Sequence, residues 1–345
     1  MALRKVGIRD VAKLAGVSLT TVSHVLNAKP ETRVTQETAS RVQLAAQELG
    51  YIPNRMARGL RKQSSDLLGL VAEEIAVTPY AGKILLGAQE EALRRDYTLA
   101  IINAELSRSN TLNAEGAKSL IDRDAAGVIF ATVYHDVVLA TKTMLESPSV
   151  IIGAREEKSR IDSICPDEQS AAQNVIQRLV EMGHQKIGFA AASDDVPATQ
   201  GRIVGYQQAM ESAGLSTTGL IAWGESNASG GYLAASELLK SAPTAIFCYN
   251  DRMAMGVYRA AFESGIKIPT DLSIVGFDDQ SPIPESLFPE LSTVALPHYE
   301  MGVKAVELLV NQLENPDRDG TEVTELLVPC PFIDRKSVAE PRKSE

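Results

Sequence analysis

The sequence predicts an α/β protein in which a small helical N-terminal domain precedes a core of two lobes. Two short amphipathic stretches separated by a glycine lie between Gly7 and Asn27. From Asp66 onward, apolar strand-like runs alternate with amphipathic helical stretches, a pattern typical of parallel sheets with helices on both faces. With 345 residues, the chain is long enough for one small domain and a two-lobed core.

The first part of this N-terminal segment predicts a helix that ends at a glycine. Its apolar residues recur at helical spacing, which gives one buried face. These residues are Ile8, Val11, Ala12 and Ala15. Gly16 can take the left-handed backbone of a C-terminal cap. Ser18 can then cap the next helix by accepting hydrogen bonds from its first free amides.

The second helix combines a short apolar stripe with an open, mostly polar face. We expect Val22, Val25 and Leu26 to be buried. The residues on or near the open face are Leu19, Thr20, Thr21, Ser23 and His24. A helix, a glycine turn and a helix with polar residues at its start form the helix-turn-helix plan, whose second helix enters the DNA major groove. An ordinary helical hairpin within a globular core would give the same pattern.

A third helix and a basic segment follow. Thr35 is the expected cap of a helix that ends at Gly50, and its apolar stripe consists of Val42, Ala45, Ala46 and Leu49. After Pro53, four of the eight residues from Arg55 to Lys62 are basic. This segment is too short to be a stable helix alone in water, so a solvated basic linker is one interpretation.

Charge is divided unevenly along the chain, whose formal net charge is −10. Through Lys62 there are eleven basic and four acidic residues, whereas the remainder has 23 basic and 40 acidic residues. A basic N-terminal part on an acidic body is typical of a protein whose N-terminal part alone approaches phosphate. An acidic protein with a chance basic end is the plainer alternative.

Several function classes lack support in the sequence. No apolar run is long enough for a transmembrane helix, and no signal peptide is recognised, so we expect a cytoplasmic protein. Cys165, Cys248 and Cys330 form no CxxC pair and are expected to be reduced and structural. The four histidines have no metal-ligand spacing, and no phosphate-binding, dinucleotide or nucleophile-elbow motif is present. We therefore expect a protein that binds no metal or cofactor and has no enzymatic activity.

The expected strands of the core are short apolar runs. They cover Leu67–Val71, Leu99–Ile102, Val128–Ala131, Val150–Ile152, Ile187–Ala191, Ala245–Cys248 and Ser273–Val275. Crossing strands near Ser163–Cys165 and Leu291–Val294 are expected to link the lobes. A helix over His298–Leu313 and the last strands, within Val323–Phe332, are assigned to the first lobe. Ligands of such sheets bind at the carboxyl ends of the strands, here in a cleft shared by the lobes.

The headpiece motifs resemble a known family. They are Asp10-Val11-Ala12, Ala15-Gly16-Val17-Ser18, Thr21-Val22-Ser23 and Val25-Leu26-Asn27. They are similar to the headpiece of the lactose-repressor/galactose-repressor family of bacterial transcription regulators. The core resembles the same family, most clearly in Gly183-His184, Ile187-Gly188, Gly201-Arg202, Gly205-Tyr206, Asn250-Asp251 and the run from Asp271 to Asp279.

This resemblance implies a domain organisation. A helix-turn-helix DNA-binding headpiece occupies residues 1–52, and a hinge helix with its linker occupies residues 53–65. A periplasmic-binding-protein-like core for effector binding and dimerisation covers residues 66–345. Its first lobe comprises about 66–162 and 294–335, and its second lobe about 163–293.

The resemblance also implies a set of DNA-contacting residues. In the family the hinge helix lies in the minor groove and wedges a leucine into a base step, and Leu60 is the matching position. His24 stands where many members carry an arginine, so that arginine's guanine contact does not carry over. The set is Ser18, Leu19, Thr20, Thr21, Ser23, His24, Asn27, Asn54, Arg55, Ala57, Arg58 and Leu60.

Effector-binding residues are expected at the cleft. Arg202, Asn250 and Asp278 match family positions that touch the effector, and an arginine fork with a carboxylate can bracket vicinal sugar hydroxyls. A buried arginine–aspartate pair that only braces the cleft is the alternative. Tyr80 and Tyr134, each expected just after a strand, are candidates to stack on a sugar face. Trp223, the only tryptophan, is either an aromatic platform or a core residue.

These expectations combine into a function. The chain is expected to be a repressor whose affinity for a near-palindromic operator is controlled by a sugar. It is expected to act as a homodimer. Its expected location is the bacterial cytoplasm, at the nucleoid and without membrane contact. A nucleoside or purine effector is an alternative, although Val196 stands where purine-responsive relatives carry an extra arginine. A sugar-binding transport protein, or an enzyme on the same core, is a third possibility.

Overall fold

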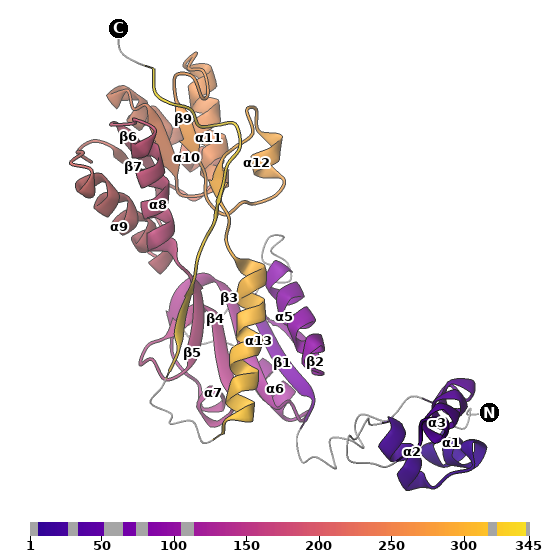
Figure 1. The fold of residues 1–345 in the computed structure, drawn as a ribbon. Coiled ribbons are helices and arrows are strands. Elements are labelled where there is room, and N and C mark those ends of the chain that lie inside the picture. Colours follow the sequence, from indigo (N-terminus) through magenta and orange to yellow (C-terminus); the bar gives the residue numbers. More distant parts are fainter. Residues whose placement is uncertain are drawn as a thin grey trace. The chain divides into compact units, whose positions relative to one another are not determined.

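The computed structural model describes residues 6–26, 34–51, 65–73, 82–104, 114–316 and 323–342 (Figure 1). The chain divides into two compact units, Met1–Ser65 and Asp66–Glu345. The first unit is helical, and the second contains parallel sheets flanked by helices. The α/β class and the helix-turn-helix expected from the sequence are therefore confirmed, while the expected hinge helix lies outside the described residues. None of the described helices is both long and apolar enough to cross a membrane.

In the described part of the first unit, three helices surround a small apolar core. They are α1 (Ile8–Ala15), α2 (Leu19–Leu26) and α3 (Gln36–Glu48). Val11, Val22 and Val42, one from each helix, are fully buried in the shared core. Val25 and Leu26 are half-buried and pack against the same cluster. Each helix thus contributes an apolar stripe, as the spacing of its hydrophobic residues predicts.

The caps that begin and end these helices are those that the sequence indicates. Gly16 has a φ of 65°, a left-handed backbone that favours glycine. The Ser18 hydroxyl oxygen accepts a hydrogen bond from the Thr21 amide over 3.0 Å. The Thr35 hydroxyl oxygen accepts one from the Thr38 amide. These interactions satisfy amides that would otherwise be left free at the first turns of α2 and α3.

The first lobe of the second unit contains a parallel sheet of six strands in the order β11-β5-β4-β3-β1-β2. The strands are β1 (Leu67–Glu73), β2 (Thr98–Ala104), β3 (Gly127–Val138), β4 (Ser149–Glu156), β5 (Asp162–Pro166) and β11 (Glu325–Val328). Its helices are α5 (Gly82–Arg94), α6 (Ala114–Ile121), α7 (Lys142–Glu146) and α13 (His298–Glu314).

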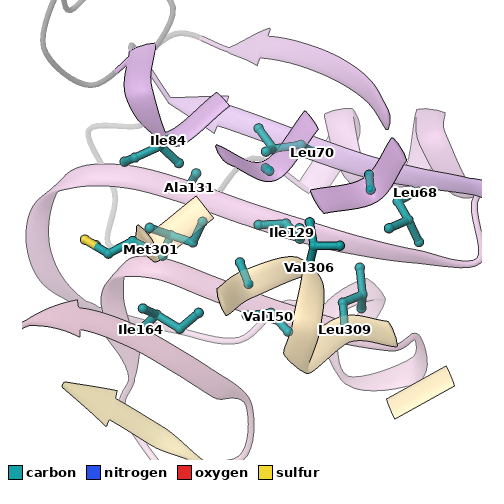
Figure 2. Packing of buried hydrophobic residues seen from close by; sticks show 14 of the residues in the cluster. Leu68, Leu70, Ile84, Ile129, Ala131, Val150, Ile164, Met301, Val306 and Leu309 are labelled. Carbon is teal, nitrogen blue, oxygen red and sulfur yellow. The ribbon is translucent and has the colours of Figure 1, made fainter. Parts of the chain in front are cut away.

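Alternating side chains of this sheet pack on opposite faces. Leu68 and Leu70 of β1 meet α5 and α13 on one face, whereas Val71 packs with α6 and α7 on the other. Figure 2 shows the first of these clusters, in which strand side chains point toward Ile84 of α5 and Met301 of α13. Burial on both faces explains why the strands are continuous apolar runs.

The second lobe contains a four-stranded parallel sheet in the order β7-β6-β8-β9. The strands are β6 (Ile187–Ala192), β7 (Ile221–Gly224), β8 (Ala245–Cys248) and β9 (Ser273–Val275). Helices α8 (Glu168–Glu181) and α9 (Pro197–Ser212) cover one face, and α10 (Ala228–Leu238) and α11 (Asp251–Glu263) cover the other. A single 3₁₀ turn (Leu239–Ser241) and the short α12 (Ile283–Ser286) complete this lobe.

The chain passes between the lobes after β5, before α13 and after β11. The second and third passages pair as an antiparallel ribbon of β10 (Thr293–Val294) and β12 (Phe332–Ile333). Figure 1 shows these segments running between the two sheets.

Two expected lobe boundaries differ in the structure. Residue 163 was expected to open the second lobe, but β5 pairs with β4 and β11 in the first-lobe sheet. The last strands were expected in the first lobe. Strand β11 does pair in the first-lobe sheet, but Phe332 of the following strand packs in the second-lobe core. The tail then stays on the second lobe, because the Ser337 hydroxyl donates to the Ile274 carbonyl and the Ser273 hydroxyl donates to the Ala339 carbonyl. These bonds satisfy backbone groups of β9 and the tail.

Candidate functional site

Helix α2 carries the residues expected to contact DNA. Leu19 and Thr20 are exposed at its N-terminal end, whereas Thr21, Ser23 and His24 are half-buried. The Thr21 hydroxyl forms a hydrogen bond of 2.8 Å with the hydroxyl of Ser18. Ser18 and Thr21 thus stabilise the start of the helix, and Leu19 and Thr20 are its most exposed expected contacts. The other expected contacts, Asn27, Asn54, Arg55, Ala57, Arg58 and Leu60, lie outside the described residues.

A cavity of about 360 Å³ lies where the lobes meet at the first and third passages. The first lobe contributes Val137, Arg155 and Leu327. The end of β5 and the start of α8 contribute Cys165, Pro166, Asp167, Glu168, Gln169 and Ser170, and α9 contributes Pro197, Ala198 and Gly201. Both lobes therefore line one cavity, and charged side chains of both signs face it.

Arg202 of α9 is buried directly behind this cavity, in a cluster of charged and aromatic groups. Its Nε donates to Oε2 of Glu168 over 2.6 Å, and its Nη2 donates to Oε1 of Glu168 over 3.2 Å and to Oδ1 of Asp278 over 3.4 Å. Its Nη1 donates to the Tyr249 carbonyl. Burial opposes the charge of Arg202, but Glu168 and Asp278 outweigh it and hold the pKa of the guanidinium above its usual value.

Aromatic rings complete the surroundings of this guanidinium. Its central carbon lies 3.6 Å from the ring centroid of Phe277 and 4.5 Å from that of Tyr249. Cation–π attraction adds to the ion pairs, and its strength grows as water is excluded. The side chain of Arg202 is only 3% exposed, so its position is fixed by protein groups on several sides.

Asp278 joins the Arg202 cluster to the passage that leads into α13. Its backbone amide donates to the Val294 carbonyl over 2.8 Å, and its carbonyl accepts from the Leu296 amide over 3.4 Å. These bonds hold Asp278 at a φ of 101°, which is strained for a residue with a side chain. Burial raises the pKa of Asp278 to about 6, with Arg202 acting in the opposite direction.

Asn250 lies beside this cluster but its side chain has a local partner at each end. Its Oδ1 caps α11 by accepting from the Met253 amide over 2.8 Å, and its Nδ2 donates to the Ser226 carbonyl over 3.3 Å. The side chain is almost fully buried. Asn250 therefore positions α11 directly after Tyr249, whose carbonyl accepts from Arg202.

The structure adds two acidic residues that sequence reasoning missed. Glu168 is the main partner of Arg202, and its only sequence signal is its place in the first turn of a helix. Asp251 accepts hydrogen bonds from the Thr293 hydroxyl over 2.6 Å and from the Gln280 amide over 2.7 Å. Burial raises the pKa of Asp251 to about 8, and the nearby charge of Asp278 adds to this effect.

Of the three expected aromatic residues, only Trp223 has a described side chain. Trp223 lies on the edge strand β7 with 55% of its surface exposed, so the core role weighed for it is wrong. It is also not among the described residues that line the cavity. Tyr134 lies within β3 rather than after it, and its side chain is not among those described. Tyr80 lies outside the described residues.

Metal and thiol chemistry find no support in the described parts of the chain. No group of three or more His, Cys, Asp or Glu side chains there could hold a metal ion. The three cysteines are free thiols. Burial raises the pKa of Cys165 to about 11, so this thiol is protonated at neutral pH and weakly nucleophilic.

Comparison with known proteins accounts for both units. Residues 7–54 match the family model of bacterial regulatory proteins of the lacI family, and residues 176–338 match that of the periplasmic binding protein-like domain. The transcriptional regulator GalR of Escherichia coli (strain K12) is 31% identical over 338 residues, which cover 97% of this chain and 96% of GalR. The chain belongs to the lacI family. It is accordingly a DNA-binding transcriptional regulator with a ligand-binding core.

Two solved structures resemble this lacI-family member along nearly its whole length. The lac repressor dimer bound to operator and the anti-inducer ONPF has a TM-score of 0.71 and 25% identity, covering 97% of this chain and 100% of that one. The regulator CelR in complex with cellobiose has a TM-score of 0.61 and 25% identity, covering 96% of this chain and 99% of the other.

Proposed function

We propose that this protein is a repressor that binds a near-palindromic operator as a homodimer, and that a sugar bound in the cavity between its lobes controls this binding. The likeness to the operator-bound lac repressor dimer supports the first part, together with the exposed start of α2. The basic composition of the chain through Lys62 supports contact with phosphates. On this proposal the chain acts in the cytoplasm at the nucleoid, as a regulator and not as an enzyme.

The cavity carries the sugar assignment. Its volume of about 360 Å³ falls in the range of small-molecule sites. The carboxylates of Asp167 and Glu168 can accept hydrogen bonds from hydroxyl groups, and the guanidinium of Arg155 can donate them. Val137, Pro166, Ala198 and Leu327 supply apolar surface for the carbon face of a ring. The likeness to a regulator in complex with cellobiose agrees with this assignment.

Arg202, Asn250 and Asp278 take defined roles in this proposal. Arg202 and Asp278 form the wall behind the cavity, where they orient Glu168. Asn250 fixes the start of α11 beside Tyr249. A bound sugar that draws the lobes together displaces Arg202 and Asp278. Asp278 transmits this displacement to the passage before α13 through its backbone hydrogen bonds.

Thermal unfolding of the full chain with candidate ligands tests the effector class. We expect galactose, cellobiose or ribose to raise the melting temperature, and adenosine or cytidine to leave it unchanged. A ligand at 100 times its dissociation constant stabilises the folded state by about 2.7 kcal/mol. Asp278→Asn is expected to weaken this response. Asp271→Asn is the matched control, because Asp271 precedes β9 whereas Asp278 follows it. We expect this control variant to keep the full increase in melting temperature.

If adenosine or cytidine raised the melting temperature and the sugars did not, the effector would be a nucleoside and not a sugar. A response of Asp278→Asn equal to that of the parent protein would remove Asp278 from the ligand-responsive wall.

A further inference from the structure

Glu168 occupies the position where an anionic ligand would have to meet Arg202. Both oxygens of its carboxylate accept hydrogen bonds from the guanidinium, so the fork of the arginine is already paired in a bidentate manner. Glu168 also lines the cavity, whereas Arg202 lies behind it. A ligand in the cavity therefore meets the carboxylate before it meets the arginine.

The charges around the cavity add to this effect. Asp167 and Glu168 face the cavity directly, and Asp278 lies behind them on Arg202. Arg155 is the one cationic side chain among the described lining residues, and its Nε lies 3.9 Å from a carboxylate oxygen of Glu325. Carboxylates therefore outnumber the cationic groups of the cavity and its wall.

Displacement of Glu168 by an anion would be unfavourable. The side chain of Glu168 is only 8% exposed, so its charge would lose Arg202 in a place where water compensates little. A neutral polyol avoids this loss, because it brings no negative charge that competes with Glu168 for Arg202, and its hydroxyl groups can donate hydrogen bonds to a carboxylate.

We propose that Glu168 selects uncharged effectors over anionic ones, so that neutral sugars bind in the cavity and sugar phosphates and sugar acids are rejected. This inference rests on the sugar site proposed above. It adds a residue and a charge class that the family membership does not supply. Glu168 acts both by contact with the ligand and by holding Arg202 away from it.

Calorimetric titration of the full chain with galactose, galacturonate, glucose 6-phosphate and inorganic phosphate tests the proposal. The parent protein is expected to bind each anion at least tenfold more weakly than the neutral sugar. Glu168→Gln keeps the size of the side chain and an acceptor for Nε but removes the charge. We expect it to bind galacturonate and inorganic phosphate at least tenfold more tightly than the parent does.

Two further variants make the result specific. Glu181→Gln removes an exposed charge at the other end of α8 and is expected to behave like the parent at equal ionic strength. Glu168→Asp keeps the charge and is expected still to reject anions. This second variant provides a test of the role of the charge even if Glu168→Gln folds poorly. Unchanged anion binding by a folded Glu168→Gln would overturn the proposal.

Tight binding of an anion by the parent protein would also overturn it, and loss of that binding in Arg155→Gln would then assign anion recognition to Arg155. If no neutral sugar binds the parent, the sugar site fails as a separate matter. The gain of anion binding in Glu168→Gln still decides the role of Glu168.

Discussion

Thr20 and His24 are two polar side chains of α2 that are expected to contact base edges. They stand four positions apart, so they lie on the same side of the helix. Thr20 is exposed and His24 is half-buried, while Val22 between them is fully buried and anchors the helix. This arrangement presents one short and one longer polar side chain from a single helix face.

We therefore predict that Thr20→Ala and His24→Ala lower the preference for operator over random DNA more than they lower general affinity. A good contact to a base edge contributes about 1–3 kcal/mol of discrimination. Competition binding with operator and random duplexes measures the preference. Gln43→Ala, at an exposed position of α3, is the control. Equal loss on both duplexes would assign these residues to backbone contact instead.

Glu168 and Asp251 show why single site residues escape sequence reasoning. Glu168 lies 34 residues before Arg202, and only the packing of α8 against α9 brings the two together. Asp251 lies 42 residues before Thr293, its partner on the passage between the lobes. Arg202 and Asp278 could be predicted because each belongs to a family motif, although Arg202 lies in the second turn of α9 and not at its start. The ion pairs of these residues depend on tertiary contacts that no local pattern encodes.

At the scale of elements, the close packing of α5 and α13 depends on two glycines. A Cβ atom at Gly302 would lie 2.2 Å from the carbonyl oxygen of Ile84, and one at Gly87 would lie 2.1 Å from that of Tyr299. Both neighbours are backbone atoms, so they cannot move aside without moving a helix. The glycines thus set the distance between two helices that cover the same face of the first-lobe sheet (Figure 1).

We predict that Gly302→Ala destabilises the protein, although alanine favours helices by about 1 kcal/mol over glycine. An extra carbon atom forced into a well-packed core typically costs about 1–3 kcal/mol, so the steric effect is expected to outweigh the propensity. Gly82→Ala is the control, because none of the described atoms lies within 4 Å of its added Cβ. Thermal unfolding followed by circular dichroism compares the variants. A melting temperature of Gly302→Ala at or above that of the parent would contradict this account.

Most regular elements could be predicted because their causes are local. Alternating apolar runs and helix caps place the headpiece helices and seven strands of the two main sheets. Strand β7 was missed because Ile221–Gly224 is short and only one of its four residues is buried, as suits an edge strand. The lobe of the C-terminal tail was also missed. Its assignment follows from distant hydrogen bonds, such as that between Ser337 and Ile274, 63 positions away.

At the scale of the whole molecule, the second lobe is connected to the first through the passage that contains β10. The backbone of Asp278 bonds to Val294 and Leu296 on this passage, and the side chain of Asp251 bonds to Thr293. The passage continues directly into α13, which packs in the first-lobe core. A displacement of Asp278 or Asp251 would therefore act directly on the passage that leads into α13.

This connection predicts that effector and operator influence each other through lobe movement. A ligand shifts an equilibrium only by its differential affinity for the two states, and the coupling between two ligands is reciprocal, typically about 1–3 kcal/mol. The factor by which the effector changes operator affinity should therefore equal the factor by which operator changes effector affinity. Titration of operator with and without the stabilising sugar, and of sugar with and without operator, measures both factors.

Asp278→Asn separates this coupling from DNA binding itself. The variant keeps the backbone bonds to Val294 and Leu296 but weakens the pairing with Arg202. We expect its operator affinity without sugar to stay within about threefold of the parent, or less than 1 kcal/mol, while the effect of the sugar on operator binding is lost. Asp271→Asn should retain the full effect. If Asp278→Asn responds like the parent, or if the parent binds sugar equally well with and without operator, the lobes do not carry the signal through this residue.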